Sequence, residues 1–222
     1  MKIARLAGLI LIAALTIYLT AAAIASAAAP EFIPGRLILY RTLSALLLWR
    51  TPSTRPIICR HSAGHGHITI RRFGLLVVDF SGCSSEEGSG CTVNSPGQSG
   101  GTIVTNELDG ELGSVKKTEA ASGVGFILLP TSGTTFATLE GTCLLVSPAP
   151  LVGTVAGEVT PVNGPASEDG KFIFNASSSA QSIKEINISG TLEKPRLRSL
   201  GLLETTESTS ELATYEVSVE VT

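Results

Sequence analysis

The chain has few of the residues from which catalytic and nucleic-acid-binding sites are commonly built. It contains three histidines, none of them after His67, and aromatic residues make up 5% of its 222 residues. An α/β-hydrolase places its histidine after the nucleophilic serine, so the lack of a late histidine argues against that class. Nucleic-acid binding needs a clustered basic face, and a chain with a net charge of −3 and few aromatic side chains is a poor candidate for it.

Residues 1–29 have the order of a secretory signal peptide. Lys2 and Arg5 precede an uncharged apolar run over residues 6–19, and the small residues 25–27 form a cleavage site before Pro30. Cleavage after residue 27 or 29 is expected. Residues 6–29 carry no charge and are also long enough to span a bilayer as a helix, so a retained anchor stays open. The sequence therefore predicts an extracellular or cell-surface protein.

Residues 30–56 are predicted to be an Arg-rich apolar linker with a short helix. Residues 37–49 form a second apolar run, too short to span a bilayer, which fits a helix on the domain or at a membrane surface. Residues 31–72 hold seven arginines against Glu31, a net charge of +6, whereas residues 73–222 have a net charge of −11. This asymmetry predicts that the Arg-rich segment meets an anionic lipid or wall surface, or folds back onto the acidic domain.

Residues 57–222 are predicted to be one all-β domain. Short alternating or β-branched runs recur between turns rich in Gly, Pro, Ser and Asn, without a dependable amphipathic helix. From Tyr215 to Val221 apolar and polar residues alternate, which places one face in the core. We expect a single antiparallel β-sandwich of jelly-roll or immunoglobulin-like type, or alternatively a barrel, preceded by the signal or anchor helix. The expected strands are 67–71, 75–80, 102–105, 124–129, 134–139, 143–146, 152–159, 171–174, 183–192 and 214–221.

Four cysteines, Cys59, Cys83, Cys91 and Cys143, follow the signal segment. An even number in an exported chain implies disulfides, and four cysteines allow three pairings. A short Ser/Glu/Gly loop between Cys83 and Cys91 favours a bond between these two, which would leave Cys59 to pair with Cys143. Free or metal-bound thiols are the alternative.

The three histidines, His61, His65 and His67, are the candidate metal ligands. His65 and His67 would project from one side of a strand, as two imidazole ligands of zinc or copper require. Spacing identifies no third ligand, and the neighbouring arginines would oppose a cation. A solvated turn that leads into a strand is therefore the favoured interpretation, and no metal or other cofactor is expected.

The sequence GQSGG at 97–101 matches the G-x-S-x-G nucleophile elbow and is similar to the serine motif of trypsin-like proteases. A trypsin-like order could be written with His67, Asp79 and Ser99. These residues fall within 33 positions, however, which is too close for two barrels to converge on one site. We expect a turn that leads into the next strand, and no catalytic role for Ser99.

A group of acidic residues, Glu107, Asp109 and Glu111, could share one face of an extended chain. Carboxylates so placed could bind calcium or act as a glycosidase pair. Asp109-Gly110 is also a typical hairpin turn between apolar residues, and the turn is the favoured interpretation.

Several segments resemble a group of uncharacterised secreted β-domain proteins of high-GC Gram-positive, actinobacterial-type bacteria. They are FSGC at 80–83, GGTIVTNELDGELG at 100–113, GVGFILLP at 123–130, VAGEVTPVN at 155–163 and EVSVEVT at 216–222. The resemblance covers residues 59–222 and implies an exported β domain with paired cysteines. Its motifs are strands and turns, so it implies no catalytic residue.

We therefore expect a noncatalytic secreted or cell-surface module with a structural or binding role. Cell-wall glycan or a surface protein is the expected partner. We expect the protein to contact the membrane only through its N-terminal segment. An exported hydrolase that cleaves glycan through unidentified carboxylates is the alternative. A concave pocket with two or more carboxylates of shifted pKa would favour the enzyme, and a filled domain would favour the module.

Overall fold

The computed structural model describes residues 29–44, 47–50, 56–85, 91–116, 122–141, 148–177, 180–199 and 203–222. All regular structure in these ranges is β-structure, as the sequence predicted. No helix within them is long and apolar enough to cross a membrane. The predicted signal or anchor segment, apart from residue 29, and Cys143 lie outside the described residues.

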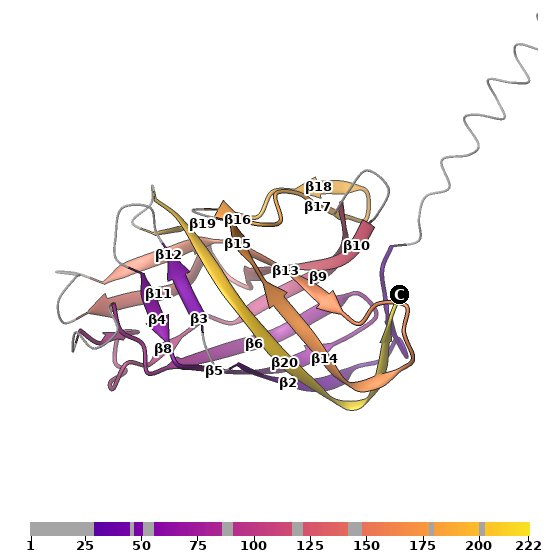
Figure 1. Cartoon of the computed structure of the whole chain (residues 1–222), viewed down its shortest axis with the longest axis horizontal. Coiled ribbons are helices and arrows are strands. Elements are labelled where there is room, and N and C mark those ends of the chain that lie inside the picture. The colour runs from indigo at the N-terminus through magenta and orange to yellow at the C-terminus, as the bar shows by residue number, and fades with distance from the viewer. Residues whose placement is uncertain are drawn as a thin grey trace, which may run out of the picture.

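Eight strands form a closed antiparallel barrel in which each strand pairs with the next one in the chain order given below (Figure 1). The last strand of this order pairs back to the first, with Tyr215 opposite Tyr40, and this pairing closes the sheet. The barrel strands are β2 (Ile38–Ser44), β5 (His61–Ile68), β6 (Arg72–Ser81), β9 (Leu108–Lys116), β10 (Ser122–Pro130), β13 (Val155–Thr160), β14 (Ser167–Phe174) and β20 (Leu203–Val221).

A second ring of backbone pairings continues the barrel at one end. It runs from β20 through β3 and β4 to two isolated bridges at Ser84, and returns through β7, β11, β12 and β19 to β20. β20 has 19 residues, long enough to take part in both rings, and crosses the whole molecule in Figure 1. The further strands of this ring are β3 (Leu47–Arg50), β4 (Ile57–Cys59), β7 (Val93–Asn94), β11 (Thr135–Gly141), β12 (Ala149–Gly153) and β19 (Leu197–Ser199).

Short strands complete the fold at the surface. β1 (Phe32–Ile33) pairs with the end of β20, and β8 (Ile103–Val104) pairs with β6. The segment with β15 (Ala176–Ser177), β16 (Ala180–Gln181), β17 (Ile186–Ile188) and β18 (Thr191–Glu193) packs on the outside of the barrel. There Ile183 and Ile186 are buried against Val115, Ile127 and Ala156 of β9, β10 and β13. The outer wall on this side is therefore covered by the chain itself.

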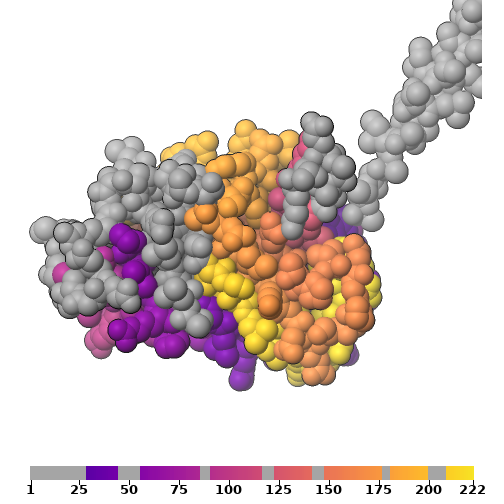
Figure 2. All heavy atoms as spheres, in the orientation of Figure 1, coloured from indigo at the N-terminus to yellow at the C-terminus, as the bar shows by residue number. Residues whose placement is uncertain are grey.

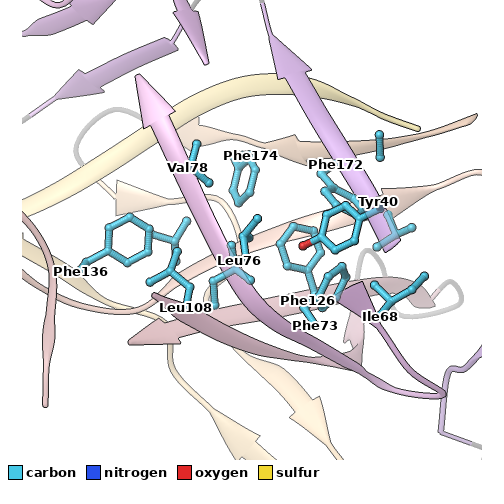
Figure 3. Packing of buried hydrophobic residues seen from close by; sticks show 14 of the residues in the cluster. Tyr40, Ile68, Phe73, Leu76, Val78, Leu108, Phe126, Phe136, Phe172 and Phe174 are labelled. Carbon is cyan, nitrogen blue, oxygen red and sulfur yellow. The ribbon is translucent and has the colours of Figure 1, made fainter. Parts of the chain in front are cut away.

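The barrel interior is filled by aromatic side chains. Phe73, Phe126 and Phe172 have ring centroids 5.0 to 5.3 Å apart, and Tyr40 packs edge-on against Phe172 (Figure 3). Phe126 and Phe174 make a further perpendicular contact at 5.4 Å. Rings at these separations add attraction between aromatic groups to the burial of their apolar surface. The few aromatic residues of the chain are thus concentrated in its core.

The all-β prediction is confirmed, and the barrel given as the alternative is the architecture found. The prediction of a linker or short helix over residues 30–56 is wrong in the described part, because β2 is a barrel strand and β3 belongs to the second ring. Ile38, Tyr40 and Thr42 point into the barrel, while Leu39 and Leu43 lie exposed on the outside. Leucines on the outer face hide the strand alternation, so the segment reads as a continuous apolar run.

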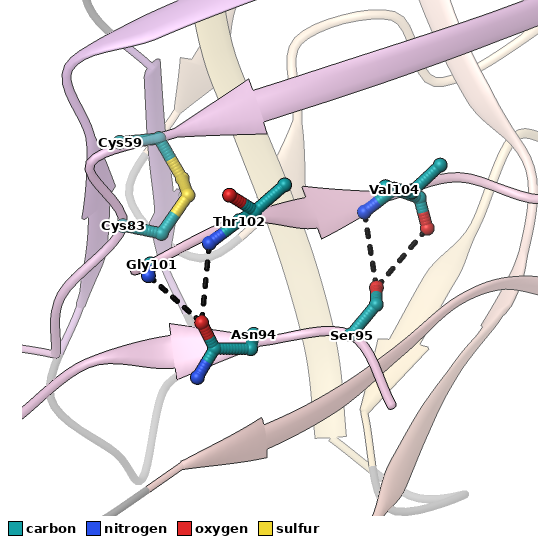
Figure 4. Close-up of a disulfide and its surroundings, with 7 residues drawn as sticks. All are labelled: Cys59, Cys83, Asn94, Ser95, Gly101, Thr102 and Val104. Carbon is teal, nitrogen blue, oxygen red and sulfur yellow. Dashed lines mark hydrogen bonds between the residues drawn. A yellow bond between two sulfur atoms is a disulfide. The ribbon is translucent and has the colours of Figure 1, made fainter. Parts of the chain in front are cut away.

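Cys59 and Cys83 form a disulfide at the end of the β5–β6 hairpin (Figure 4). Ile58 and Ser84 exchange two backbone hydrogen bonds of 2.8 Å, which makes the adjacent Cys59 and Cys83 a non-hydrogen-bonded pair. Opposed Cα atoms approach most closely at such positions, and here they are 3.9 Å apart. Disulfides persist in oxidising compartments, so the bond is in keeping with an extracellular environment.

The predicted pairing of Cys83 with Cys91 is therefore wrong. Strand register, not the short distance in sequence, brings a cysteine opposite Cys83, and that cysteine is Cys59. The predicted bond from Cys59 to Cys143 is excluded by the same finding. Cys91 is disulfide-bonded as well.

Candidate functional site

The inside of the barrel leaves almost no free space. Its cavity measures about 10 Å³, which is room for one water molecule at most, and phenylalanines form much of its wall. A ligand site normally needs several hundred cubic ångströms. The interior is therefore a packed core, although the carboxyl group of Glu211 reaches into it.

Glu211 is a buried carboxyl group on the inner face of β20. The Ser62 hydroxyl of β5 donates a hydrogen bond of 2.8 Å to Glu211 Oε1. Burial raises the pKa of this carboxyl above its ordinary range, and the hydrogen bond from Ser62 opposes that rise. Burial also raises the pKa of Tyr40 and Tyr215, and the proximity of Glu211 adds to the effect on Tyr40. The sequence did not single out Glu211, although the alternation from Tyr215 to Val221, continued backward, places residue 211 on the core face.

A ligand-sized hollow lies instead on the outer wall of the barrel, over β20, β2, β5 and β6. It has a volume of about 490 Å³ and is open to solvent. On the surface, β20 lies between β2 and β14 (Figure 2). The hollow is lined by Leu43, Ser44, His61, Ser62, Ala63, Asp79, Ser81 and Leu212.

Strand register places these side chains together. Leu43 stands opposite Leu212 on one side and opposite Ala63 on the other, and Asp79 follows opposite Ala63. Because cross-strand neighbours point to the same face, this row forms an apolar floor that ends at a carboxylate. His61 lies opposite Ser81 in the adjacent row and adds an imidazole and a hydroxyl at the edge. The hollow can therefore take an apolar group and offer it polar contacts on one side.

The hollow combines a serine, a histidine and an aspartate, but they are not joined as a catalytic set. His61, Asp79 and Ser81 are all exposed, and the structure contains no hydrogen bond among these three side chains. A nucleophile, its base and the group that orients the base are normally within hydrogen-bond reach. The arrangement suits hydrogen bonding to a bound molecule better than acyl transfer.

The candidate metal ligands all belong to β5. His61 and His65 are exposed, and a bulge between His65 and His67 breaks the regular register. The His67 ring lies over Gly74 of β6, where a Cβ atom would come within 2.6 Å of Nε2. No cluster of three or more His, Cys, Asp or Glu side chains suited to a metal ion occurs in the part of the chain that the structure describes.

The GQSGG segment forms the connection between β7 and β8. Asn94 Oδ1 accepts hydrogen bonds from the backbone N–H groups of Gly101 and Thr102, at 2.8 and 3.2 Å (Figure 4). Gly101 has a φ of 78° and lies so close to Cys83 that a Cβ atom would come within 2.8 Å of its backbone N and O. Positive φ and this close approach require glycine, so the motif has a structural reason. Ser99 is exposed on this connection.

The trypsin-like set of His67, Asp79 and Ser99 is not assembled. His67 is opposite Gly74, whereas Asp79 is opposite Ala63, four residues from His67 along β5. Four residues of extended strand span about 13 Å, far beyond hydrogen-bond reach. The prediction that Ser99 lies in a turn leading to a strand is confirmed.

The acidic residues near the start of β9 do not form a hairpin turn. Asp109 and Gly110 pair with Leu129 and Leu128 of β10 inside the strand, so the predicted turn at these residues is wrong. Gly110 is there because a Cβ atom would come within 2.6 Å of the Ile127 carbonyl oxygen. Glu111 faces Arg72 across the strands at 3.9 Å.

Comparison of the chain with protein-family models, with curated proteins and with solved structures finds no match, so the candidate site rests on its own geometry.

Proposed function

We propose that the protein is a noncatalytic extracellular or cell-surface module of a bacterium, exported by its N-terminal segment, that binds a partner at the hollow on its outer wall. The proposal rests on the location of the free space, which is outside the barrel and not inside it. The barrel interior has a cavity of about 10 Å³, whereas the outer hollow has about 490 Å³ and an apolar floor. A filled barrel makes a rigid support, and a rigid support holds surface side chains in fixed positions for binding.

The composition of the hollow supports a partner with both apolar and polar groups. Leu43 and Leu212 are each about half exposed or more, at 62 and 47%, and form a pair across the strands. Asp79 makes no ion pair with a described residue and stands at the end of the apolar floor. Cell-wall material offers such groups in its glycan and its peptides, as does the surface of another protein.

Sedimentation with insoluble cell-wall peptidoglycan tests this proposal. The wild-type protein and the Leu43→Ser/Leu212→Ser variant are mixed with the wall material, and the bound fraction is measured after centrifugation. Loss of two half-buried leucine contacts is expected to weaken binding about tenfold or more. The matched control is Leu129→Ser/Leu192→Ser, which changes two leucines of 41 and 61% exposure away from the hollow.

Equal binding by both double variants would show that the hollow is not the binding site. The same samples are assayed for released reducing sugar. Release of sugar that Asp79→Asn abolishes would replace the binding module with the alternative, an exported glycan hydrolase. Absence of binding to peptidoglycan, with capture of a surface protein that needs Leu43 and Leu212, would identify the partner as protein.

A further inference from the structure

Asp79 is an exposed carboxylate at one end of the apolar floor of the outer hollow. Its cross-strand neighbours are Ala63 on β5 and Val104 on β8, neither of which carries a charge. Val77 and Ser81, the next residues on the same face of β6, are uncharged as well. Within the described ranges, no lysine or arginine side chain comes within ion-pair distance of this carboxylate. Its charge is therefore available to a partner from outside.

Ala63 leaves a gap between Leu43 and Asp79 on the outer wall. It lies between these two residues in the cross-strand row, and its side chain is the smallest of the row. Adjacent strands are about 4.8 Å apart, so the backbones of Leu43 and Asp79 are about 10 Å apart across the gap. An aliphatic chain that lies on Leu43 and Ala63 therefore brings its end to the carboxylate.

Two cations of this wall lie on other sides of the hollow. Lys171 stands opposite Leu212, at the end of the row away from Asp79. Arg41 precedes Leu43 by two residues on the same face of β2, and both cations are exposed. A cationic group is repelled by these two side chains and attracted by Asp79. The charges of the wall therefore orient an apolar ligand with one cationic end, and direct that end to β6.

We propose that the hollow binds a primary amine on an unbranched aliphatic chain, as the side chain of lysine carries it, in the peptide part of the cell wall. The aliphatic stem lies on Leu43 and Ala63, and the ammonium group pairs with Asp79. A lysine side chain suits this arrangement because it joins a compact charge to a flexible stem of four carbons. The proposal rests on the proposed function, since it names the chemical group that binds in the same hollow.

The small extent of the apolar surface favours a wall peptide over another protein. A stable protein interface usually buries about 800 Å² on each partner and has an apolar core. Here the row beside the floor consists of Arg41, His65 and Thr214, all of them exposed. The hollow itself has about 490 Å³, a volume typical of a site for one small molecule. A flexible peptide can place one amine there without burying the charged residues around it.

Titration with two small amides tests recognition of the amine itself. N-acetyl-lysine methylamide and N-acetyl-norleucine methylamide have the same four-carbon stem, and only the first ends in an ammonium group. Binding is followed by the methyl NMR signals of Leu43, Ala63 and Leu212 in the mature protein. The pH is kept at about 8, where the imidazoles of His61 and His65 carry no charge that would repel the amine. The lysine amide is expected to bind about fivefold more tightly than the norleucine amide.

Asp79→Asn removes the charge of this side chain and keeps its shape. The variant is expected to lose the fivefold preference and to bind both amides equally. Asp109→Asn is the matched control, because Asp109 is an exposed aspartate on β9 outside the hollow, and it is expected to keep the preference. Thermal unfolding confirms that both variants are folded. Sedimentation with peptidoglycan whose amines have been acetylated is the second measurement, and the bound fraction is expected to fall about fivefold.

The outcomes separate this proposal from the proposed function. Equal binding of the two amides, with sedimentation that needs Leu43 and Leu212 but is unchanged by acetylation, would overturn the amine and leave the binding module in place. Absence of both sedimentation and methyl shifts would overturn both. A preference for the lysine amide that persists in Asp79→Asn would overturn the pairing with this carboxylate. Preference for the lysine amide without sedimentation, and with capture of a surface protein, would overturn the wall peptide as the source of the amine.

Discussion

The buried carboxyl of Glu211 is expected to make the barrel more stable in acid than at neutral pH, and Glu211→Gln tests this. Burial raises the pKa of this group above its ordinary value of 4.5. At pH values between 4.5 and the raised pKa, the Glu211 carboxyl is protonated in the native protein and ionised in the unfolded chain. The contribution of the neutral carboxyl is thus complete below pH 4.5 and is lost as pH rises through the native pKa.

The size of the effect follows from linkage. Stability falls by about 1.4 kcal/mol for each pH unit over which only the native carboxyl is protonated. For a domain of this size, that corresponds to about 3 to 6 °C in melting temperature per pH unit. Glutamine keeps an oxygen that can accept the Ser62 hydrogen bond, but its side chain cannot ionise. The variant therefore lacks the part of the fall in stability with pH that comes from Glu211. Its stability relative to the wild type is expected to grow as pH rises.

Thermal and urea unfolding are measured from pH 4 to 8 for the wild type, Glu211→Gln and Glu216→Gln. Glu216 is exposed on the same strand and serves as the control, with a pH profile that follows the wild type. Parallel profiles for the wild type and Glu211→Gln would refute the reasoning, because they would show that the native carboxyl is as readily ionised as the unfolded one.

Three further predictions concern the disulfide, the core and the chain start. Replacing Cys59 and Cys83 by serine removes a bond that closes 24 residues and is expected to cost about 3 kcal/mol in urea unfolding; an unchanged midpoint would contradict this. Phe126→Ala, which removes a ring in contact with three other phenylalanines, is expected to cost about 3 to 5 kcal/mol, and a loss below about 1 kcal/mol would show a poorly packed interior. The measured mass of the mature protein is expected to match a chain that begins at Ala28 or Pro30. An intact chain from Met1, recovered from membranes, would instead identify residues 1–29 as an anchor.

Local pattern was enough to predict the class of the fold. The alternation from Tyr215 to Val221 is found in β20, with Tyr215, Val219 and Val221 buried and Val217 packed against the core. Alternation failed where both faces of a strand are apolar. β2 has Ile38 and Tyr40 inside and Leu39 and Leu43 outside, so its period of two is invisible in a hydropathy pattern.

The sequence by itself determined that this chain makes strands and turns, because a period of two in hydrophobicity and the placement of Gly and Pro are local properties. Only the tertiary structure decided how the sheet closes, since closure depends on β20 finding β2 across more than 150 residues. The same long-range register chose Cys59 as the partner of Cys83, buried Glu211 beside Ser62 and set Leu43 against Leu212. A local pattern cannot predict pairings between distant strands, because the hydrophobic alternation of one strand does not specify which other strand it pairs with.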